Sequence, residues 1–329
     1  MFGGGNVEKM KRFTRMIVLS LVLMLTGGIF APAVTALAEE TTYPVTIKHE
    51  SGETVIEKEP ERIVVLDIAA LDTIDKVGAG DKVVGTITDR LPDSLAKYRD
   101  LESVGSPKEP DMEAIARLEP DLVFIGNRLA DMYSDFSEHW TTINSAVSWR
   151  GIPEGETYSE KVPENVLMVA TAVGKKKEGE AARQELIDLM AKYKDLGKDK
   201  GKALVLMSNG GEISMHGPAS RFALIFDVFG FENVDYEGED EGHKGQKISF
   251  ETVQEINPDW IFVLDRDAAV GKAETGDTAQ SVMDNDLVKS TNAAKEGHIV
   301  YLSPTEWYIV MTGANNYETM LNEVAEAIK

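Results

Sequence analysis

EAIARLEPDLVFIGNR (residues 113–128) and ETVQEINPDWIFVLDR (residues 251–266) share one pattern, and that pattern predicts the fold. In both stretches a glutamate, a Pro-Asp pair, an apolar run and an arginine occupy matching positions. A Pro-Asp pair ends a helix and turns the chain into a strand. Because open α/β sheets place ligands at the carboxyl ends of their strands, the two copies predict two lobes with Arg128 and Arg266 on a shared cleft. An alternative interpretation, in which both arginines are solvated loop residues, stays open at this point.

The chain on either side of these stretches alternates between short apolar runs and amphipathic patterns. Strands are predicted at residues 62–66, 82–86, 122–125, 203–207, 260–264 and 299–302. Helices are predicted at residues 69–77, 112–118, 221–229 and 312–328. Such alternation is typical of parallel α/β units with right-handed crossovers.

Residues 175–197 separate the two halves and carry apolar side chains at helical spacing, without a proline. A helix of about 20 residues spans about 30 Å, roughly one domain diameter. We therefore expect an α/β fold of two Rossmann-like lobes, joined by this single long α-helix, with the ligand cleft between them. The N-terminal lobe is expected at residues 39–174 and the C-terminal lobe at 198–329. An ordinary amphipathic surface helix is the alternative for 175–197.

The first 38 residues have the pattern of a secretory signal peptide. Four basic residues precede an apolar run at 16–30, and a small-residue site follows, with cleavage expected after Ala38. An uncleaved membrane anchor is the alternative, and Met10 is a second candidate for the start of the chain. Cleavage would remove the four bases and Glu8, so the formal charge would change from -22 to -25. Since no cysteine is present for lipid attachment, a periplasmic protein is expected.

Composition excludes several classes of function. The chain has 34 Lys and Arg residues against 56 Asp and Glu residues, so nucleic acid and anionic lipid are not expected as partners. The absence of cysteine excludes disulfides, thiolate metal sites and a cysteine nucleophile. Any site must therefore consist of histidine, tyrosine, arginine and carboxylates.

Motifs of common enzymes and cofactor sites are missing. The chain has no G-x-S-x-G elbow and no H-E-x-x-H pair, and its five histidines are scattered without paired spacing. Two residues in loops of the second half remain as candidates, His243 and Tyr308. Phenolate oxygen suits a trivalent ion, and imidazole accepts iron as a borderline ligand. On these residues alone, a surface histidine and an interfacial tyrosine are the simpler interpretation.

Four short motifs carry a resemblance to a known family: SPKEPD at 106–111, GPASRF at 217–222, FVLDR at 262–266 and the pair Trp307-Tyr308. With these motifs the chain resembles the substrate-binding proteins of ABC importers of the long-helix-linked class, which take up ferric siderophores, haem and cobalamin. The resemblance covers nearly all of residues 60–329. It is strongest to the branch that binds catecholate siderophores, which includes enterochelin-uptake and petrobactin-binding proteins.

The resemblance implies a role for each candidate residue. Three arginines would surround an anionic, enterobactin-like catecholate complex, two residues would coordinate its iron, and one glutamate per lobe would dock onto the membrane permease. The three arginines are Arg128, Arg221 and Arg266. The two iron-coordinating residues are His243 and Tyr308, and the two docking glutamates are Glu113 and Glu251. The family implies a monomer that catalyses nothing, has no intrinsic cofactor and takes the ferric siderophore as its ligand. Glu306 departs from the pattern, because relatives can carry an aromatic residue there.

Charge and coordination favour one ligand type within this class. Fe(III) held by three catecholates carries a formal charge of minus three and by two catecholates minus one, so either complex needs cationic partners when it leaves water. Because a bis-catecholate leaves two iron positions open, a preference for tetradentate over hexadentate siderophores is expected. The alternatives are a haem, cobalamin or hydroxamate-siderophore binder, an exported α/β hydrolase acting on siderophores, and a binder of free metal ions.

Overall fold

The computed structural model describes residues 40–235, 245–272 and 278–329; the expected signal peptide and His243 lie outside these ranges. The first lobe is built on a five-stranded sheet in the order β5-β4-β3-β6-β7, and every neighbouring pair is parallel. The strands are β3 (Ile63–Val65), β4 (Val83–Thr86), β5 (Glu102–Ser103), β6 (Leu122–Ile125) and β7 (Thr142–Asn144). An antiparallel hairpin, β1 (Val45–His49) and β2 (Gly52–Ile56), precedes this sheet.

Short helices connect the strands of the first lobe, and side-chain caps begin several of them. Asp67, for example, accepts a hydrogen bond from the backbone N–H of Ala69 at the start of the first α-helix. The α-helices are α2 (Ile68–Lys76), α3 (Met112–Arg117) and α4 (Tyr133–Ser137), and the 3-10 helices are η1 (Gly80–Lys82), η2 (Asp93–Tyr98) and η3 (Asn127–Met132).

The second lobe has a six-stranded sheet that is only partly parallel, which corrects the expectation of purely parallel units. Its main path runs β11-β9-β8-β12-β13, and β10 pairs with β8. The strands are β8 (Lys202–Asn209), β9 (Glu212–His216), β10 (Glu232–Asn233), β11 (Gln246–Ile248), β12 (Trp260–Asp265) and β13 (Ile299–Leu302). β9 is antiparallel to β8 because Gly210 and Gly211 both take positive φ angles and form a two-residue hairpin turn.

The helix expected at 221–229 is shorter in the structure, where α7 covers only Ala223–Asp227. Arg221 therefore precedes the helix instead of lying within it. The other helices of this lobe are α8 (Phe250–Ile256), α9 (Arg266–Ala269), α10 (Ala279–Met283), α11 (Asp286–Lys289), α12 (Asn292–Glu296), the π-helical turn η5 (Glu306–Val310) and α13 (Ala314–Ala327).

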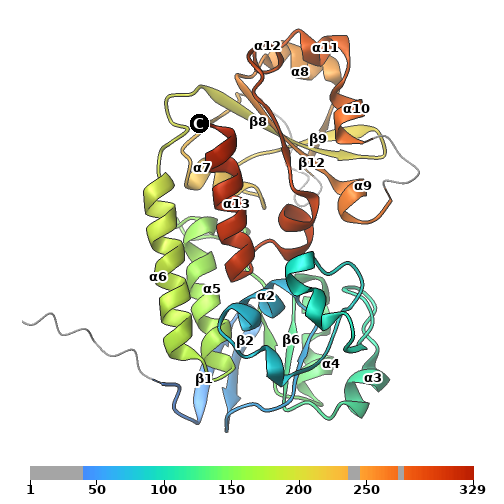
Figure 1. The fold of residues 1–329 in the computed structure, drawn as a ribbon, viewed down its shortest axis with the longest axis vertical. Helices are drawn as coiled ribbons and strands as arrows, with labels where there is room; N and C mark the ends of the chain where they lie inside the picture. Colours follow the sequence, from blue (N-terminus) through green and yellow to red (C-terminus); the bar gives the residue numbers. More distant parts are fainter. Residues whose placement is uncertain (1–39, 236–244, 273–277) are drawn as a thin grey trace, which may run out of the picture. The chain divides into compact units, whose positions relative to one another are not determined.

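Two antiparallel helices lie between the sheets in sequence, α5 (Tyr158–Ala172) and α6 (Lys176–Tyr193), and they run side by side in Figure 1. The sequence pattern predicts a helix at 175–197 but does not predict α5. The observed helix α6 ends at Tyr193, because Asp195 takes a left-handed φ of 62° and its N–H bonds to the carbonyl of Val228. Residues 194–197 therefore turn towards the second lobe.

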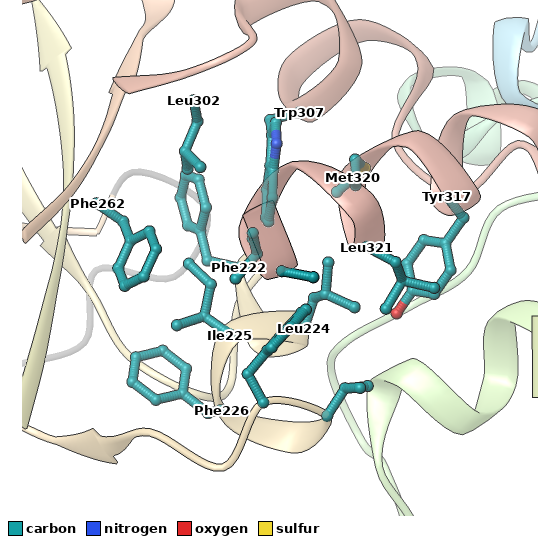
Figure 2. Packing of buried hydrophobic residues seen from close by; sticks show 14 of the residues in the cluster. Phe222, Leu224, Ile225, Phe226, Phe262, Leu302, Trp307, Tyr317, Met320 and Leu321 are labelled. Carbon is teal, nitrogen blue, oxygen red and sulfur yellow. The ribbon is translucent and has the colours of Figure 1, made fainter. Parts of the chain in front are cut away.

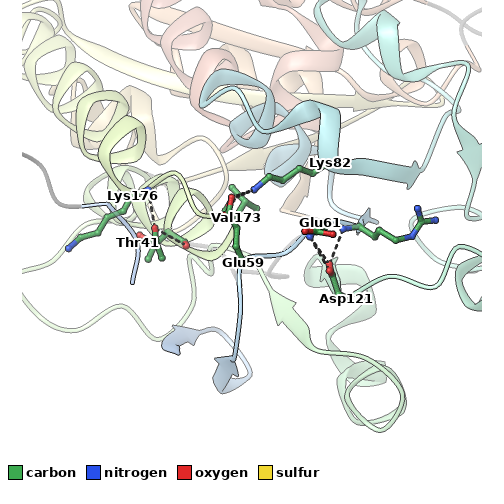
Figure 3. A network of polar contacts seen from close by, with 9 residues as sticks. Thr41, Glu59, Glu61, Lys82, Asp121, Val173 and Lys176 are labelled. Atoms are coloured by element: carbon green, nitrogen blue, oxygen red, sulfur yellow. Dashed lines mark hydrogen bonds and ion pairs between the residues drawn. The ribbon is translucent and has the colours of Figure 1, made fainter. Parts of the chain in front are cut away.

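Polar contacts fasten the turn between α5 and α6 to the first lobe (Figure 3). Lys82 donates to the Val173 carbonyl at 3.1 Å and pairs with Glu59. On the other side of the turn, the Lys176 N–H donates to the Thr41 hydroxyl at 3.3 Å. These bonds satisfy backbone groups that the ends of the two helices leave free.

The largest buried cluster belongs mainly to the second lobe, and Figure 2 shows part of it, including Phe222, Phe262, Trp307 and Tyr317. Phe222 and Trp307 stack at 6.0 Å between ring centroids, and both are fully buried. The Trp307 indole N–H donates to Glu323 at 2.6 Å, so its one polar atom is satisfied. This stack fixes the chain on both sides of it.

The C-terminal part of the chain also reaches the first lobe. Val310 is buried in the first lobe's core cluster, together with residues of β3 and α2. Asp72 of α2 accepts the backbone N–H groups of Asn315 and Asn316 at 2.8 and 3.1 Å, and so caps the first turn of α13. The α/β fold class is confirmed. Among the described helices, none combines the length and apolarity that crossing a membrane requires.

Candidate ligand-binding site

Asp121 and Asp259, from the two Pro-Asp pairs, hold equivalent positions in the two lobes. Asp121 accepts hydrogen bonds from the backbone N–H groups of Glu61 and Arg62 at 2.9 to 3.2 Å. Asp259 accepts one from the N–H of Lys202 at 2.9 Å. Each carboxylate ties the start of its own strand, β6 or β12, to the start of the neighbouring strand, β3 or β8. The residues that follow β6 and β12 are therefore delivered to the carboxyl edges of their sheets.

A cavity of about 140 Å³, partly open to solvent, is lined by residues of both lobes. The first lobe contributes the segments after β3 and β6, including Asp67 and Arg128. The second lobe contributes Arg221 and the segment 308–312, which begins with Tyr308. The predicted cleft is thus present between the two lobes. On the side of the first lobe it lies at the carboxyl ends of β3 and β6, whereas Arg266, which follows β12, is not part of its lining.

Three guanidinium groups surround the Tyr308 ring. The central guanidinium carbons of Arg128, Arg221 and Arg266 lie 5.7, 4.6 and 5.6 Å from the ring centroid. Arg266 also donates from Nε to the Tyr308 hydroxyl at 3.0 Å. The structure therefore brings together, around one phenol, the three arginines that the sequence analysis selected.

The Phe222–Trp307 stack explains why Arg221 and Tyr308 meet. Each site residue is the sequence neighbour of one buried ring, so the stack in the core places Arg221 and Tyr308 beside each other on the cavity wall. Arg221 is further held between two aromatic faces, since its guanidinium lies 5.6 Å from the Trp149 ring and 4.6 Å from that of Tyr308.

The electrostatics of this group favour an anion. Burial alone would raise the pKa of Tyr308, but the hydrogen bond from Arg266 and the charges of the three arginines lower it below its usual value. Burial and the like charges of Arg128 and Arg266 lower the pKa of Arg221. An additional negative charge would relieve this repulsion between cations. The site can therefore stabilise an anionic ligand and an ionised phenol.

The remaining sequence candidates lie apart from this cavity. Glu113 and Glu251 are exposed in the first turns of α3 and α8, next to the capping residues Asp111 and Ser249. The Glu306 side chain is not part of the cavity lining. His243 lies outside the described residues, so its predicted position is not tested. Within the described ranges, no group of three or more His, Asp or Glu side chains could hold a metal ion.

Sequence reasoning missed several cavity residues, among them Asp67, Trp149 and Tyr158. Asp67 follows β3, so the rule that selected Arg128 and Arg266 would also have selected it. Trp149 lies in the irregular segment before α5, and Tyr158 is the first residue of α5, which the sequence analysis did not identify. Neither position carries a local pattern that points to a ligand.

Comparison with known families defines the class of protein. The periplasmic binding protein family model matches residues 63–306, and the chain belongs to this family. The assignment made from the sequence motifs is thereby confirmed. Because the family and the relatives below are substrate-binding proteins, the hydrolase alternative is wrong.

Two relatives show the likeness in detail. The petrobactin-binding protein YclQ of Bacillus subtilis is 37% identical over 294 residues, covering 87% of this chain and 88% of that protein, and its crystal structure superposes with a TM-score of 0.79. The periplasmic catecholate-siderophore binding protein VctP of Vibrio cholerae superposes with a TM-score of 0.77 at 33% identity, covering 88% of this chain and 100% of that chain.

A third relative binds a named siderophore of its own. The ferric-anguibactin-binding protein FatB of Vibrio anguillarum is 27% identical over 315 residues, covering 94% of this chain and 95% of that protein. The ligands in the names of YclQ, VctP and FatB are those that these relatives bind.

Proposed function

We propose that this chain is an extracytoplasmic binding protein that captures a ferric catecholate siderophore in the cavity between its lobes and delivers it to an ABC importer. The observation that carries the proposal is the group of three guanidiniums around the Tyr308 ring. The names of YclQ and VctP support the ligand class. A monomeric, periplasmic protein with a signal peptide cleaved after Ala38 is part of the same proposal.

The charge of the ligand is opposite to the charge of the site. Ferric bis- and tris-catecholates are anions, and the cavity presents Arg128 and Arg221 directly, with Arg266 behind Tyr308. Arginine suits this task because its planar guanidinium stays charged and donates several hydrogen bonds to catechol oxygens. The residues that meet the anion are therefore cationic, although the chain as a whole carries a net negative charge.

Tyr308 is the proposed iron ligand within the described residues. A bis-catecholate leaves two coordination positions on the iron, and the Tyr308 phenolate would take one of them; His243 would take the other. The lowered pKa of Tyr308 favours the phenolate form. Tris-catecholates fill all six iron positions and would rely on the arginines alone, so tetradentate siderophores should bind more tightly.

A titration of tryptophan fluorescence with ferric bis- and tris-catecholates tests this proposal. In Tyr308→Phe, loss of the phenolate ligand should weaken the binding of the bis-catecholate about tenfold or more. The same substitution should weaken the binding of the tris-catecholate much less. Equal losses for both complexes, or none, would contradict direct ligation. If neither complex binds to the wild-type protein, the catecholate proposal itself fails.

Glu113 and Glu251 are the proposed contacts with the permease. Both are exposed, both lie in the first turn of a short helix, and each belongs to a different lobe. This symmetry fits a partner that carries one basic patch for each lobe. Both residues belong to the two matching stretches, so they can be tested as a pair.

A further inference from the structure

The wall of the cavity formed by the first lobe carries a carboxyl group, Asp67. It follows β3 and lines the cavity together with Ile68 and Gly126. Its Oδ2 accepts a hydrogen bond from the Ser145 hydroxyl at 2.7 Å, and its Oδ1 accepts one from the Ala69 N–H at 3.2 Å. Both donors are neutral, and each oxygen keeps a further lone pair.

No cation compensates this carboxyl group within the described part of the chain. The ion pairs that the structure shows there do not include Asp67, and burial raises the pKa of its side chain. A side chain at position 126 would crowd the group, since a Cβ there would lie 3.1 Å from the Asp67 carboxyl carbon. Glycine at this position leaves the carboxyl uncovered on that side.

Tyr158 adds a second polar group to the same cavity. The residue is among those that line the cavity and is 3% exposed, and its buried hydroxyl has no hydrogen-bond partner among the described residues. Burial raises the pKa of Tyr158, and the charges of Arg221 and Asp67 both act on it. A buried hydroxyl without a partner is unfavourable until a bound molecule supplies one.

We propose that Asp67 and Tyr158 form a second subsite, which receives a protonated amine of the ligand while the arginines hold its anionic iron-binding groups. This inference rests on the proposed function and specifies the ligand further: the preferred siderophore carries a cationic group at a distance from the iron. An ammonium group can donate hydrogen bonds both to the free lone pairs of Asp67 and to the Tyr158 oxygen.

The opposite charges of Asp67 and the arginines would favour one orientation of such a ligand. The ammonium is repelled by Arg128 and Arg221 and attracted by Asp67. The anionic ferric catecholate is attracted by the two arginines and repelled by Asp67. A neutral amide would leave the carboxylate buried without a counter-charge, which is unfavourable. The structure therefore favours a cation over a neutral donor.

A role as helix cap alone does not account for Asp67. The cap uses Oδ1, and Ser145 occupies only one position on Oδ2. Asparagine caps helices about as well as aspartate. Asp67→Asn therefore removes the charge and keeps the cap, which makes it the appropriate variant.

The test uses two ferric bis-catecholates built on the same linear triamine, in which the central nitrogen is either a free ammonium or acetylated. Wild-type protein should bind the ammonium form at least about tenfold more tightly. Asp67→Asn should abolish this preference, and Tyr158→Phe should reduce it severalfold. Asp227→Asn is the matched control: its carboxyl is partly buried and also has a raised pKa but lies outside the cavity lining, so the preference should persist.

Three results would overturn the inference. Equal affinity of the wild-type protein for both chelates would exclude an ammonium subsite while leaving the proposed function intact. A preference that persists in Asp67→Asn would show that Asp67 does not recognise the amine. If neither chelate binds to the wild-type protein, the proposed function fails, and this inference fails with it.

Discussion

Residues 113–128 and 251–266 can be compared position by position. Both stretches begin in a capped helix, turn at a residue with left-handed backbone, tie their strand to a central neighbour through an aspartate, and end in an arginine. The arginines differ. Arg266 donates to Tyr308 at 3.0 Å and to Asn209 at 2.8 Å, whereas Arg128 is exposed and forms no hydrogen bond with other described residues.

This difference indicates that Arg266 and Arg128 contribute to ligand binding in different ways. Arg266 is oriented before a ligand arrives, so little of its conformational freedom is lost on binding. Arg128 lies over the Tyr308 ring but must be ordered by the ligand itself. The same local fold thus supplies one preformed contact and one adaptable contact, while the glutamates at the start of both stretches remain equivalent.

The equivalence of the glutamates can be tested by reversing their charge. The double variant Glu113→Arg with Glu251→Arg should lose nearly all siderophore uptake in cells, at least about tenfold, because repulsion replaces both docking contacts. Its affinity for the siderophore in vitro should stay unchanged. A double reversal at the exposed residues Glu138 and Glu326 is the control for net charge. Normal uptake by the first double variant would contradict the docking role.

The difference between the arginines predicts unequal losses. Arg266→Gln should weaken ferric bis-catecholate binding about 100-fold, because it removes a preformed charge and the hydrogen bond that favours the Tyr308 phenolate; Arg128→Gln should cost about tenfold. Fluorescence titration measures both, with the exposed Arg117→Gln as control. Equal losses would show that the hydrogen bonds of Arg266 give it no advantage.

The smallest expected effect concerns the turn before each Pro-Asp pair. Glu119 and Asn257 have φ angles of 46° and 45°, and asparagine tolerates this conformation better than glutamate. Glu119→Asn should raise the free energy of unfolding by about 0.5 to 1 kcal/mol. Asn257→Glu should lower it by about 1 to 2 kcal/mol, because it also removes the bond that Asn257 accepts from the Asn292 N–H. Denaturant unfolding measures both, and changes of the same sign would contradict the comparison.

Local patterns were sufficient for part of the fold. The central strands were identified because fully buried parallel strands read as continuous apolar runs, as in β6 and β12. Helix α5 was missed because Pro163 lies inside it, and a proline there normally argues against a helix. Packing on both of its sides overrides that preference: Val166 lies in the core of the second lobe and Val169 in that of the first.

The site was predictable to the extent that it follows strand ends. Arg128 and Arg266 could be found because their positions depend only on β6 and β12. The contact of Trp149 with Arg221 depends on how an irregular segment packs, which no periodicity records. The unpartnered hydroxyl of Tyr158 is likewise a property of the folded interior.

The last stretch of the chain has a consequence for the order in which the molecule can assemble. Val310 fills the core of the first lobe, and Asp72 of that lobe finds its partners only at the start of α13. During synthesis from the amino end, the first lobe cannot complete its interior until almost the whole polypeptide has emerged. The two lobes therefore complete their folding together. In a chain that stops before residue 310, the core of the first lobe stays incomplete.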